Sequence, residues 1–307
     1  MDLLQTRDLA AHSQSSKDTS FRRFFVNEQG IRAGWSALMF AGIYIGLQLL
    51  QQKVLGHFMS LDVPHEIPPN LGILFEGLEV LTVFLATWIM SRIEKRSVFS
   101  YSFAGEHRAI RFFGGLIWGF VCLSALVGIL WKAGFIAFSG FALSGSTAMK
   151  YALVWGFVFL LVGISEESTL RGYMQYTLTR GIGFWWAALL LSIVFATGHI
   201  GNSGENLLGI LQVCVGGLLF CLGLYFTKSL FWSVGFHAGW DWAQSYFYGT
   251  PDSGLLMKGH LLISHPQGKT LWSGGSAGPE GSILLLPLVL VFSALMWLWW
   301  RKLRPAQ

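Results

Sequence analysis

The chain has 307 residues, of which 53% are hydrophobic and 12% charged, and its formal net charge is +5. A soluble domain carries roughly 25% charged residues, so this composition excludes an ordinary soluble globular protein. The 14 Trp, 25 Phe and 37 Gly fit a helical membrane protein, in which glycine and interfacial aromatic residues are favoured. The cysteines Cys122, Cys214 and Cys221 lie in apolar stretches without a CxxC spacing, which predicts free, buried thiols.

The predicted elements begin with a polar segment, residues 1–33, which lacks the apolar core of a cleaved signal peptide and is expected in the cytoplasm. Residues 34–301 are expected to form a transmembrane helical domain. Most of its apolar stretches are near the ~20 residues needed to cross a bilayer. They predict eight transmembrane helices, at 34–50, 71–91, 113–135, 150–165, 183–200, 207–227, 229–248 and 282–300. The fold class is therefore an all-α polytopic membrane protein with a polar intramembrane cavity, and the glycine-rich loop 249–281 is expected to be an external excursion.

The basic residues predict the orientation of these helices. Of the 21 Lys and Arg residues, 16 fall in segments on the same side as the N-terminus and 5 fall on the other side. Basic residues gather on the cytoplasmic side of membrane proteins, so both termini are expected in the cytoplasm, with the plasma membrane as the location in a bacterium. The positive charge is thus an orientation signal, and we expect the lipid bilayer and no nucleic acid as a partner.

Ionisable residues within a bilayer are costly and mark candidate functional sites. The first motif lies in the fourth helix and runs from Ser165 to Arg171. Glu167 and Arg171 are four residues apart, which predicts an ion pair on one helix face. Glu166 is rotated by about 100° and is left free. A partly desolvated carboxylate suits a general base or acid, although an ordinary solvated salt bridge at a helix end is equally compatible with this motif alone.

The second motif is the stretch from Phe195 to His199 in the fifth helix. A single histidine in an apolar helix is commonly a hydrogen-bonded packing residue. However, if the chain turns between Gly181 and Gly183, Glu166 and His199 lie within about 5 Å of the same depth on neighbouring antiparallel helices.

The third motif pairs His237 with Asp241, again four residues apart. The carboxylate could fix the tautomer of the imidazole, or the two side chains could merely satisfy each other. Gly235 and Gly239 leave a groove beside them that would allow another helix to approach closely.

Together, in this order on three helices, the motifs resemble the CPBP family of intramembrane proteases, which includes CAAX-processing Rce1-type enzymes and bacteriocin self-immunity proteins. The family signature EExxxR, FxxxH and HxxxN or HxxxD is matched by Glu166-Glu167 with Arg171, Phe195 with His199, and His237 with Asp241. The resemblance covers residues 150–245, the expected protease core, and the number of predicted helices also resembles the eight-helix arrangement of that family.

The resemblance implies an intramembrane endopeptidase acting on a membrane-anchored protein or peptide, in a hydrophilic cavity open to the cytoplasm. Water would be activated by Glu166 and His199, and the oxyanion stabilised by His237 and Asp241. Glu167 and Arg171 would hold the helix geometry and tune the base.

Two features leave the chemistry open. Many family members carry Asn at the position of Asp241, and an ionised Asp repels an oxyanion that an amide would bind. Asp241 could instead orient His237, remain protonated or bind a metal. His199, His237 and Glu166 could hold zinc as three protein ligands plus water, but HExxH is absent, and we favour water activated by Glu166 and His199 without an obligatory metal.

Several other questions stay open at this stage. Glu76 and Glu79, three residues apart on the second helix, could line the cavity, bind a substrate terminus or pair with a basic group. The alternative function is a non-proteolytic membrane protein, either a binding, immunity or scaffold protein that retains the cavity, or a transporter that relays protons. The substrate and the oligomeric state do not follow from the sequence.

Overall fold

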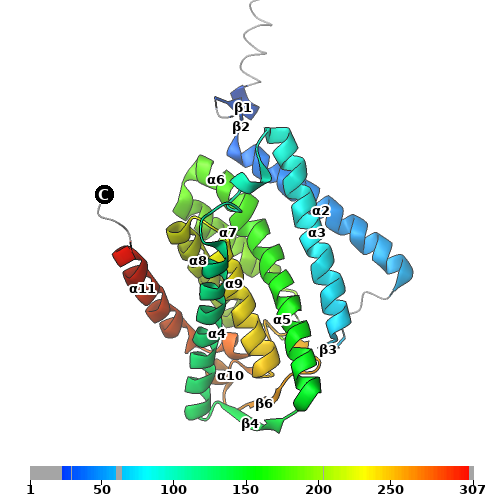
Figure 1. The fold of residues 1–307 in the computed structure, drawn as a ribbon, viewed down its shortest axis with the longest axis vertical. Coiled ribbons are helices and arrows are strands. Elements are labelled where there is room, and N and C mark those ends of the chain that lie inside the picture. Colours follow the sequence, from blue (N-terminus) through cyan, green and yellow to red (C-terminus); the bar gives the residue numbers. More distant parts are fainter. Residues whose placement is uncertain (1–22, 29, 60–63, 203, 304–307) are drawn as a thin grey trace, which may run out of the picture.

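The computed structural model describes residues 23–28, 30–59, 64–202 and 204–303, so most of the predicted polar segment 1–33 lies outside the described residues. A helix forms over each of the eight predicted apolar stretches (Figure 1). These helices are α2 (Ala33–Phe58), α3 (Pro69–Glu94), α4 (Arg108–Lys132), α5 (Gly145–Glu167), α7 (Phe184–Gly198), α8 (Leu207–Thr227), α9 (Phe231–Asp241) and α11 (Leu285–Leu303).

Five helices in the described residues are long and apolar enough to cross a membrane. They are α2, α3, α4, α8 and the continuous helix Gly145–Ile182 that begins with α5. The chain is therefore an integral membrane protein of the all-α class. The helices α7, α9 and α11 fall outside this set, so the prediction of eight spans is supported for five of them and stays a prediction for the other three.

The helix that begins with α5 changes its winding in the middle. After Glu167 it continues as the π-helical segment η2 (Ser168–Met174) and then as α6 (Gln175–Ile182). Wider π-helical turns are rare and occur frequently at functional sites. Gly183, at φ +82°, then reverses the chain into α7, because glycine adopts this backbone conformation without a steric penalty. The predicted bend between Gly181 and Gly183 is confirmed.

Three small two-stranded sheets, which the sequence did not predict, accompany the helices. Strand β1 (Val26–Asn27) pairs antiparallel with β2 (Gly30–Ile31), β3 (Glu66–Ile67) pairs parallel with β5 (Leu256–Met257), and β4 (Ile136–Phe141) pairs antiparallel with β6 (Leu262–Pro266). The last two sheets tie the loop 249–281 to the segments that precede α3 and α5. The remaining short elements are η1 (Val98–Ser100), η3 (Trp242–Phe247), α10 (Thr270–Ser273), η4 (Gly275–Ala277) and η5 (Pro279–Gly281).

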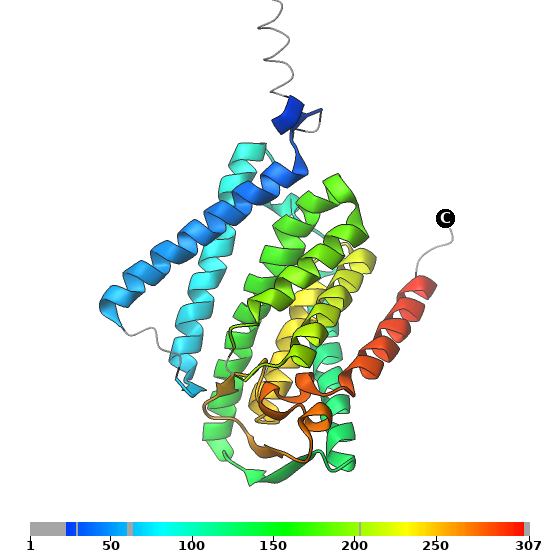
Figure 2. The ribbon, with the colours of Figure 1, turned by 180° about the vertical axis from the view of Figure 1, so that it is seen from behind.

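The loop 249–281, expected as an excursion, is folded against one end of the helix bundle (Figure 2). It is anchored by hydrogen bonds such as Asn202 Nδ2 to the Ser253 carbonyl and Ser276 Oγ to the Gly204 carbonyl. The strands β1 and β2 and the α6–α7 turn lie at the opposite end of the bundle from this loop, and α11 leaves the loop and diverges from the bundle (Figure 1). The cytoplasmic location of both termini stays a prediction.

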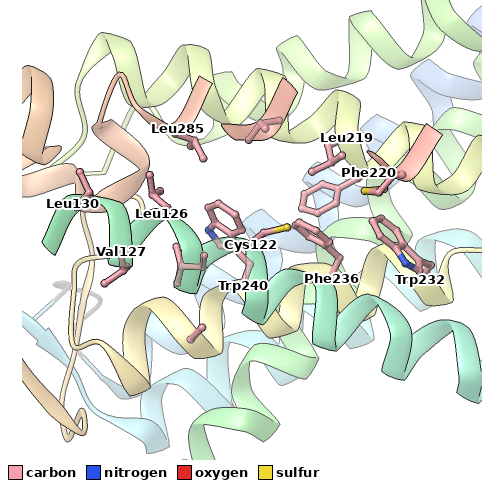
Figure 3. Close-up of a cluster of buried hydrophobic side chains, with 14 of the residues drawn as sticks. Cys122, Leu126, Val127, Leu130, Leu219, Phe220, Trp232, Phe236, Trp240 and Leu285 are labelled. Carbon is pink, nitrogen blue, oxygen red and sulfur yellow. The ribbon is translucent and has the colours of Figure 1, made fainter. Parts of the chain in front are cut away.

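Helices α4 and α9 pack with their backbones in contact. A Cβ atom on Gly115, Gly119, Gly235 or Gly239 would lie only 2.0–2.2 Å from a carbonyl oxygen of the facing helix. The groove predicted from Gly235 and Gly239 therefore exists, and α4 occupies it. Large apolar side chains from α4, α8, α9 and α11 pack beside this contact, among them Cys122, Phe220, Phe236, Trp240 and Leu285 (Figure 3).

The thiols agree with the sequence prediction in most respects. All three cysteines are free, and Cys122 and Cys221 are buried, whereas Cys214 is only partly buried.

Candidate active site

A cavity of about 740 Å³ lies inside the bundle, lined by residues of α2, α3, α5, α7, α8, α9, α11 and the folded loop. Its walls are largely apolar, with side chains such as Val158, Phe159 and Leu219. The three predicted motifs all reach it: Glu166, His199, His237 and Asp241 are among its lining residues. Segments that are far apart in the sequence thus place their polar side chains in one cavity.

Glu167 and Arg171 form the predicted ion pair, with Arg171 Nη1 at 3.1 Å from Glu167 Oε1, and neither side chain is exposed. The guanidinium carbon of Arg171 lies 4.6 Å from the centre of the Phe195 ring and 5.1 Å from that of Phe220. A cation between two aromatic faces is stabilised by their negative faces. Gly217 makes room for this group, since a Cβ atom there would lie 2.8 Å from Arg171 Nη2.

His237 lies at the centre of the polar cluster. Its Nδ1 is 3.1 Å from Glu167 Oε1, so the imidazole and Arg171 share one carboxylate. On the other side of the ring, Nε2 is 3.5 Å from Glu166 Oε2 and 3.6 Å from Asp241 Oδ2. These two separations fall within ion-pair range but exceed an ordinary hydrogen bond. The ring of Phe220 stacks on the imidazole with centroids 4.9 Å apart.

The geometry bears on the role of Asp241, which the sequence left open. One of the alternatives was that Asp241 fixes the tautomer of His237, and in the structure the group hydrogen-bonded to Nδ1 is Glu167, from a different helix. The side chain of Glu166, predicted to be free, is about one third exposed (34%) and faces His237 Nε2. The two adjacent glutamates therefore occupy different environments, one sealed in the ion pair and the other open to the cavity.

His199 directly follows α7 and is oriented by its own helix. Its Nδ1 is 2.9 Å from the carbonyl oxygen of Phe195, which can only accept a hydrogen bond, so Nδ1 carries a proton. The neutral ring then has its lone pair on Nε2. His199 makes no hydrogen bond or ion pair with Glu166 in the described part of the chain. The two residues share the cavity, as their predicted depths indicated.

The second helix of the sequence contributes further acids to this cavity. Glu76 Oε2 accepts a hydrogen bond from Ser165 Oγ at 3.4 Å, and Glu79 accepts hydrogen bonds from Tyr44 Oη, at 2.8 Å, and from Gln48. Both glutamates line the cavity. Of the roles open to them from the sequence, cavity lining is the one confirmed.

The folded loop contributes two acids that sequence reasoning missed, Asp252 and Glu280. Asp252 Oδ2 accepts a hydrogen bond from Ser245 Oγ at 3.0 Å. Burial, and then the nearby Glu280 carboxylate, raise the pKa of Asp252 well above its usual 3.8. Glu280 accepts hydrogen bonds from Trp240 Nε1 at 2.7 Å and from Ser253 N and Oγ at 3.2 and 2.9 Å. No local motif surrounds these acids, so the only signal was their position in a loop long enough to fold back.

The zinc hypothesis named His199, His237 and Glu166 as ligands. Among the described residues, no group of three or more His, Cys, Asp or Glu side chains is arranged to hold a metal ion. Both nitrogens of His237 face carboxylate oxygens, and the Nδ1 position is taken by Glu167. The residues as arranged therefore do not fit a zinc site, and we derive no step through a metal.

Comparison with known proteins gives one match. Residues 148–243 match the family model described as type II CAAX prenyl endopeptidase Rce1-like. No curated protein and no solved structure matches the chain. The matched residues hold all three motifs and extend over nearly the same range as the resemblance found in the sequence, which confirms it. The segment 148–243, and with it the polar centre of the cavity, is therefore similar to the Rce1-like family of type II CAAX prenyl endopeptidases.

Proposed function

We propose that the chain is an intramembrane endopeptidase that hydrolyses a peptide bond of a membrane-anchored protein or peptide. The observation that carries this proposal is the pairing of a cavity-facing Glu166 with His237 inside a helix bundle, in a segment similar to the Rce1-like family. Hydrolysis needs a base for the water, a donor for the oxyanion and a cavity that admits the substrate, and each has a candidate here.

The environments of the two glutamates support different roles. Glu167 is fully buried, and its Oε1 atom is already paired with both Arg171 and His237. Glu166 is about one third exposed and lines the cavity, whereas Glu167 is not among the lining residues. We therefore assign general base catalysis to Glu166 and a positioning role to Glu167.

His199 would assist the same step. With Nδ1 donating to the Phe195 carbonyl, Nε2 is available to accept a hydrogen bond or a proton from water. The Phe195 ring lies edge-on to this imidazole at 4.9 Å, so the FxxxH motif holds the ring by both a backbone and a side-chain contact.

His237 is the candidate oxyanion donor. Its Nδ1 donates to Glu167, and a proton on Nε2 would point toward Glu166 and Asp241, at the side where a carbonyl oxygen would develop charge. Arg171, Glu167 and His237 form a continuous chain from cation to carboxylate to imidazole. An ionised Asp241 would stabilise the protonated ring from the Nε2 side, whereas a protonated Asp241 would instead donate a hydrogen bond to the oxyanion.

In this assignment the peptide bond is hydrolysed by addition of water and loss of the amine. Water adds to the carbonyl carbon while Glu166, with His199, accepts its proton. The carbonyl oxygen becomes an oxyanion beside His237. The C–N bond then breaks as the oxyanion reforms the carbonyl, and the proton passes to the leaving amine. The products are a new carboxyl terminus and a new amino terminus.

The test compares new peptide termini in membranes from cells that express the wild type or Glu166→Gln at equal levels. The substitution keeps the side-chain shape and removes the base. Glu106→Gln, in an exposed loop, serves as the matched control. Termini that appear with the wild type and the control, but not with Glu166→Gln, would support proteolysis. The same termini in all three would favour a non-proteolytic binding, immunity or scaffold protein.

A further inference from the structure

The residues assigned to catalysis are carried by helices that pack in different parts of the bundle. Helix α7, which ends immediately before His199, packs mainly on α8 and α6. Helix α9, which carries His237 and Asp241, packs mainly on α4 and α5. The position of His199 relative to the other two residues therefore depends on the groups that link the ends of α7 and α9.

A chain of hydrogen bonds makes this link through the folded loop. Asn202, three residues after His199, donates from Nδ2 to the Ser253 carbonyl at 2.8 Å. Ser253 in turn donates from N and Oγ to Glu280 Oε2, at 3.2 and 2.9 Å. The other oxygen of Glu280, Oε1, accepts from Trp240 Nε1 at 2.7 Å, and Trp240 lies in the last turn of α9. The two oxygens of one carboxylate thus hold two separate segments of the chain.

The middle of this chain of hydrogen bonds has a strained backbone. Ser253 has a φ of +44°, in the left-handed region that residues other than glycine rarely adopt. Residues in this conformation persist where their surroundings fix them, and they cluster at functional sites. The adjacent backbones are also in close contact, since a Cβ atom on Gly204 would lie 2.7 Å from Gly254 Cα. The loop therefore has little freedom to move relative to the segment that follows His199.

We propose that Glu280 is a positioning residue for the endopeptidase reaction, because its carboxylate fixes His199 relative to His237. The proposal rests on the proposed function and adds the folded loop to the active site. Glu280 acts through the hydrogen bonds of the chain and not on the reacting atoms. It lies outside residues 148–243, so the family match assigns no role to it. All four members of the chain line the cavity: Asn202, Trp240, Ser253 and Glu280.

The position of Glu280 requires a carboxylate, because the three groups hydrogen-bonded to it are all donors. An ionised carboxylate has only acceptors, whereas an amide has one oxygen and an NH2 group that only donates. In Glu280→Gln the NH2 group must face either Trp240 or Ser253, so one of the two links is lost while the size of the side chain is kept. Losing a hydrogen bond to a charged group changes an equilibrium about tenfold or more.

The first test measures the link without requiring cleavage. Hydrogen exchange of the backbone amides is followed by mass spectrometry in the purified full-length wild type, in Glu280→Gln and in the control Glu66→Gln. Glu66 is an exposed carboxylate on β3, the strand that pairs with β5 of the same loop. In Glu280→Gln, residues 199–202 and 252–254 should exchange about tenfold faster or more, because these segments open more easily. The control should exchange like the wild type. Unchanged exchange of residues 199–202 in Glu280→Gln would overturn the proposal.

The second test measures kcat and KM on a peptide identified from the membrane termini. Glu280→Gln should lower kcat about tenfold or more and leave KM within about twofold of the wild type, because displaced catalytic groups slow the chemical step more than they weaken binding. Glu66→Gln should keep both constants. A residue that supports only the fold would lower the unfolding temperature without this selective loss, and a wild-type kcat in Glu280→Gln would overturn the proposal.

A double variant tests whether Glu280 acts through the chain of hydrogen bonds. Asn202→Ala cuts the same chain at its other end and should lower kcat by a similar factor. Because both residues act through Ser253, the double variant should be about as slow as the slower single variant. Losses that multiply in the double variant would contradict the proposal. If no cut depends on Glu166, the endopeptidase function fails, and the exchange measurement still decides whether Glu280 joins the two helix ends.

Discussion

Substituting Gly115 by Ala tests whether the backbone contact between α4 and α9 holds His237 in place. A Cβ atom on Gly115 would lie 2.1 Å from the Trp232 carbonyl oxygen and 2.8 Å from Phe236 N, immediately before His237 in the chain. Ordinary carbon–oxygen contacts are about 3.3 Å or longer, so the two helices must separate locally by about 1 Å. Gly114 provides an adjacent control, because a Cβ atom there would meet nothing within 4 Å.

The expected magnitudes follow from this separation. Forcing an extra methyl group into a close-packed contact costs about 1–3 kcal/mol of folding free energy. A displacement of about 1 Å at a catalytic group can lower the rate about 100-fold. Gly115→Ala should therefore lower the thermal unfolding temperature and reduce cleavage strongly, whereas Gly114→Ala should leave both close to the wild type.

The assay measures thermal unfolding of both purified variants in detergent and their kcat/KM on a peptide identified from the membrane termini. Equal stability and equal activity of Gly115→Ala and Gly114→Ala would refute the claim that this helix contact positions His237. A loss of stability without any loss of activity would show that the contact supports the fold alone.

Three further predictions concern charges and metal. Arg171→Met should lower the free energy of unfolding, measured in detergent, by about 3–5 kcal/mol, because Glu167 would be left buried without its cation. A variant as stable as the wild type would contradict this. Folded Asp252 holds its proton above the usual pKa of 3.8, so the free energy of unfolding should fall as pH rises from that value toward the raised pKa. Unfolding temperatures measured across this pH range should fall less steeply in Asp252→Asn, and parallel slopes would argue against the raised pKa. Dialysis against a chelator should leave cleavage unchanged, whereas a loss that zinc restores would assign His199 and His237 to metal binding.

Much of the fold was predictable because its signals are local. Each apolar stretch is long enough to form a helix, and Gly183 marks the reversal between α6 and α7. The spacing of Gly235 and Gly239 predicted a close helix contact, but it could not identify α4 as the partner, because that choice depends on tertiary packing. The π-helical segment Ser168–Met174 also had no distinct pattern in the sequence.

The sequence predicted which residues make up the candidate site better than it predicted which of them contact one another. Spacing along one helix correctly paired Glu167 with Arg171. The contact between Glu167 and His237 joins residues 70 positions apart, so spacing within either motif could not indicate it. Asp252 and Glu280 were missed for the same reason, since they reach the cavity only because the loop folds back against the bundle.

The most direct measurement follows the oxygen atom of the attacking water. Purified wild-type protein and Glu166→Gln are incubated in ¹⁸O-labelled water with a peptide identified from the membrane termini, and the products are weighed by mass spectrometry. The account predicts one ¹⁸O atom in the new carboxyl terminus with the wild type, and no product with Glu166→Gln. Cleavage by Glu166→Gln at the wild-type rate, or an unlabelled new carboxyl terminus, would contradict the claim that Glu166 activates water for hydrolysis.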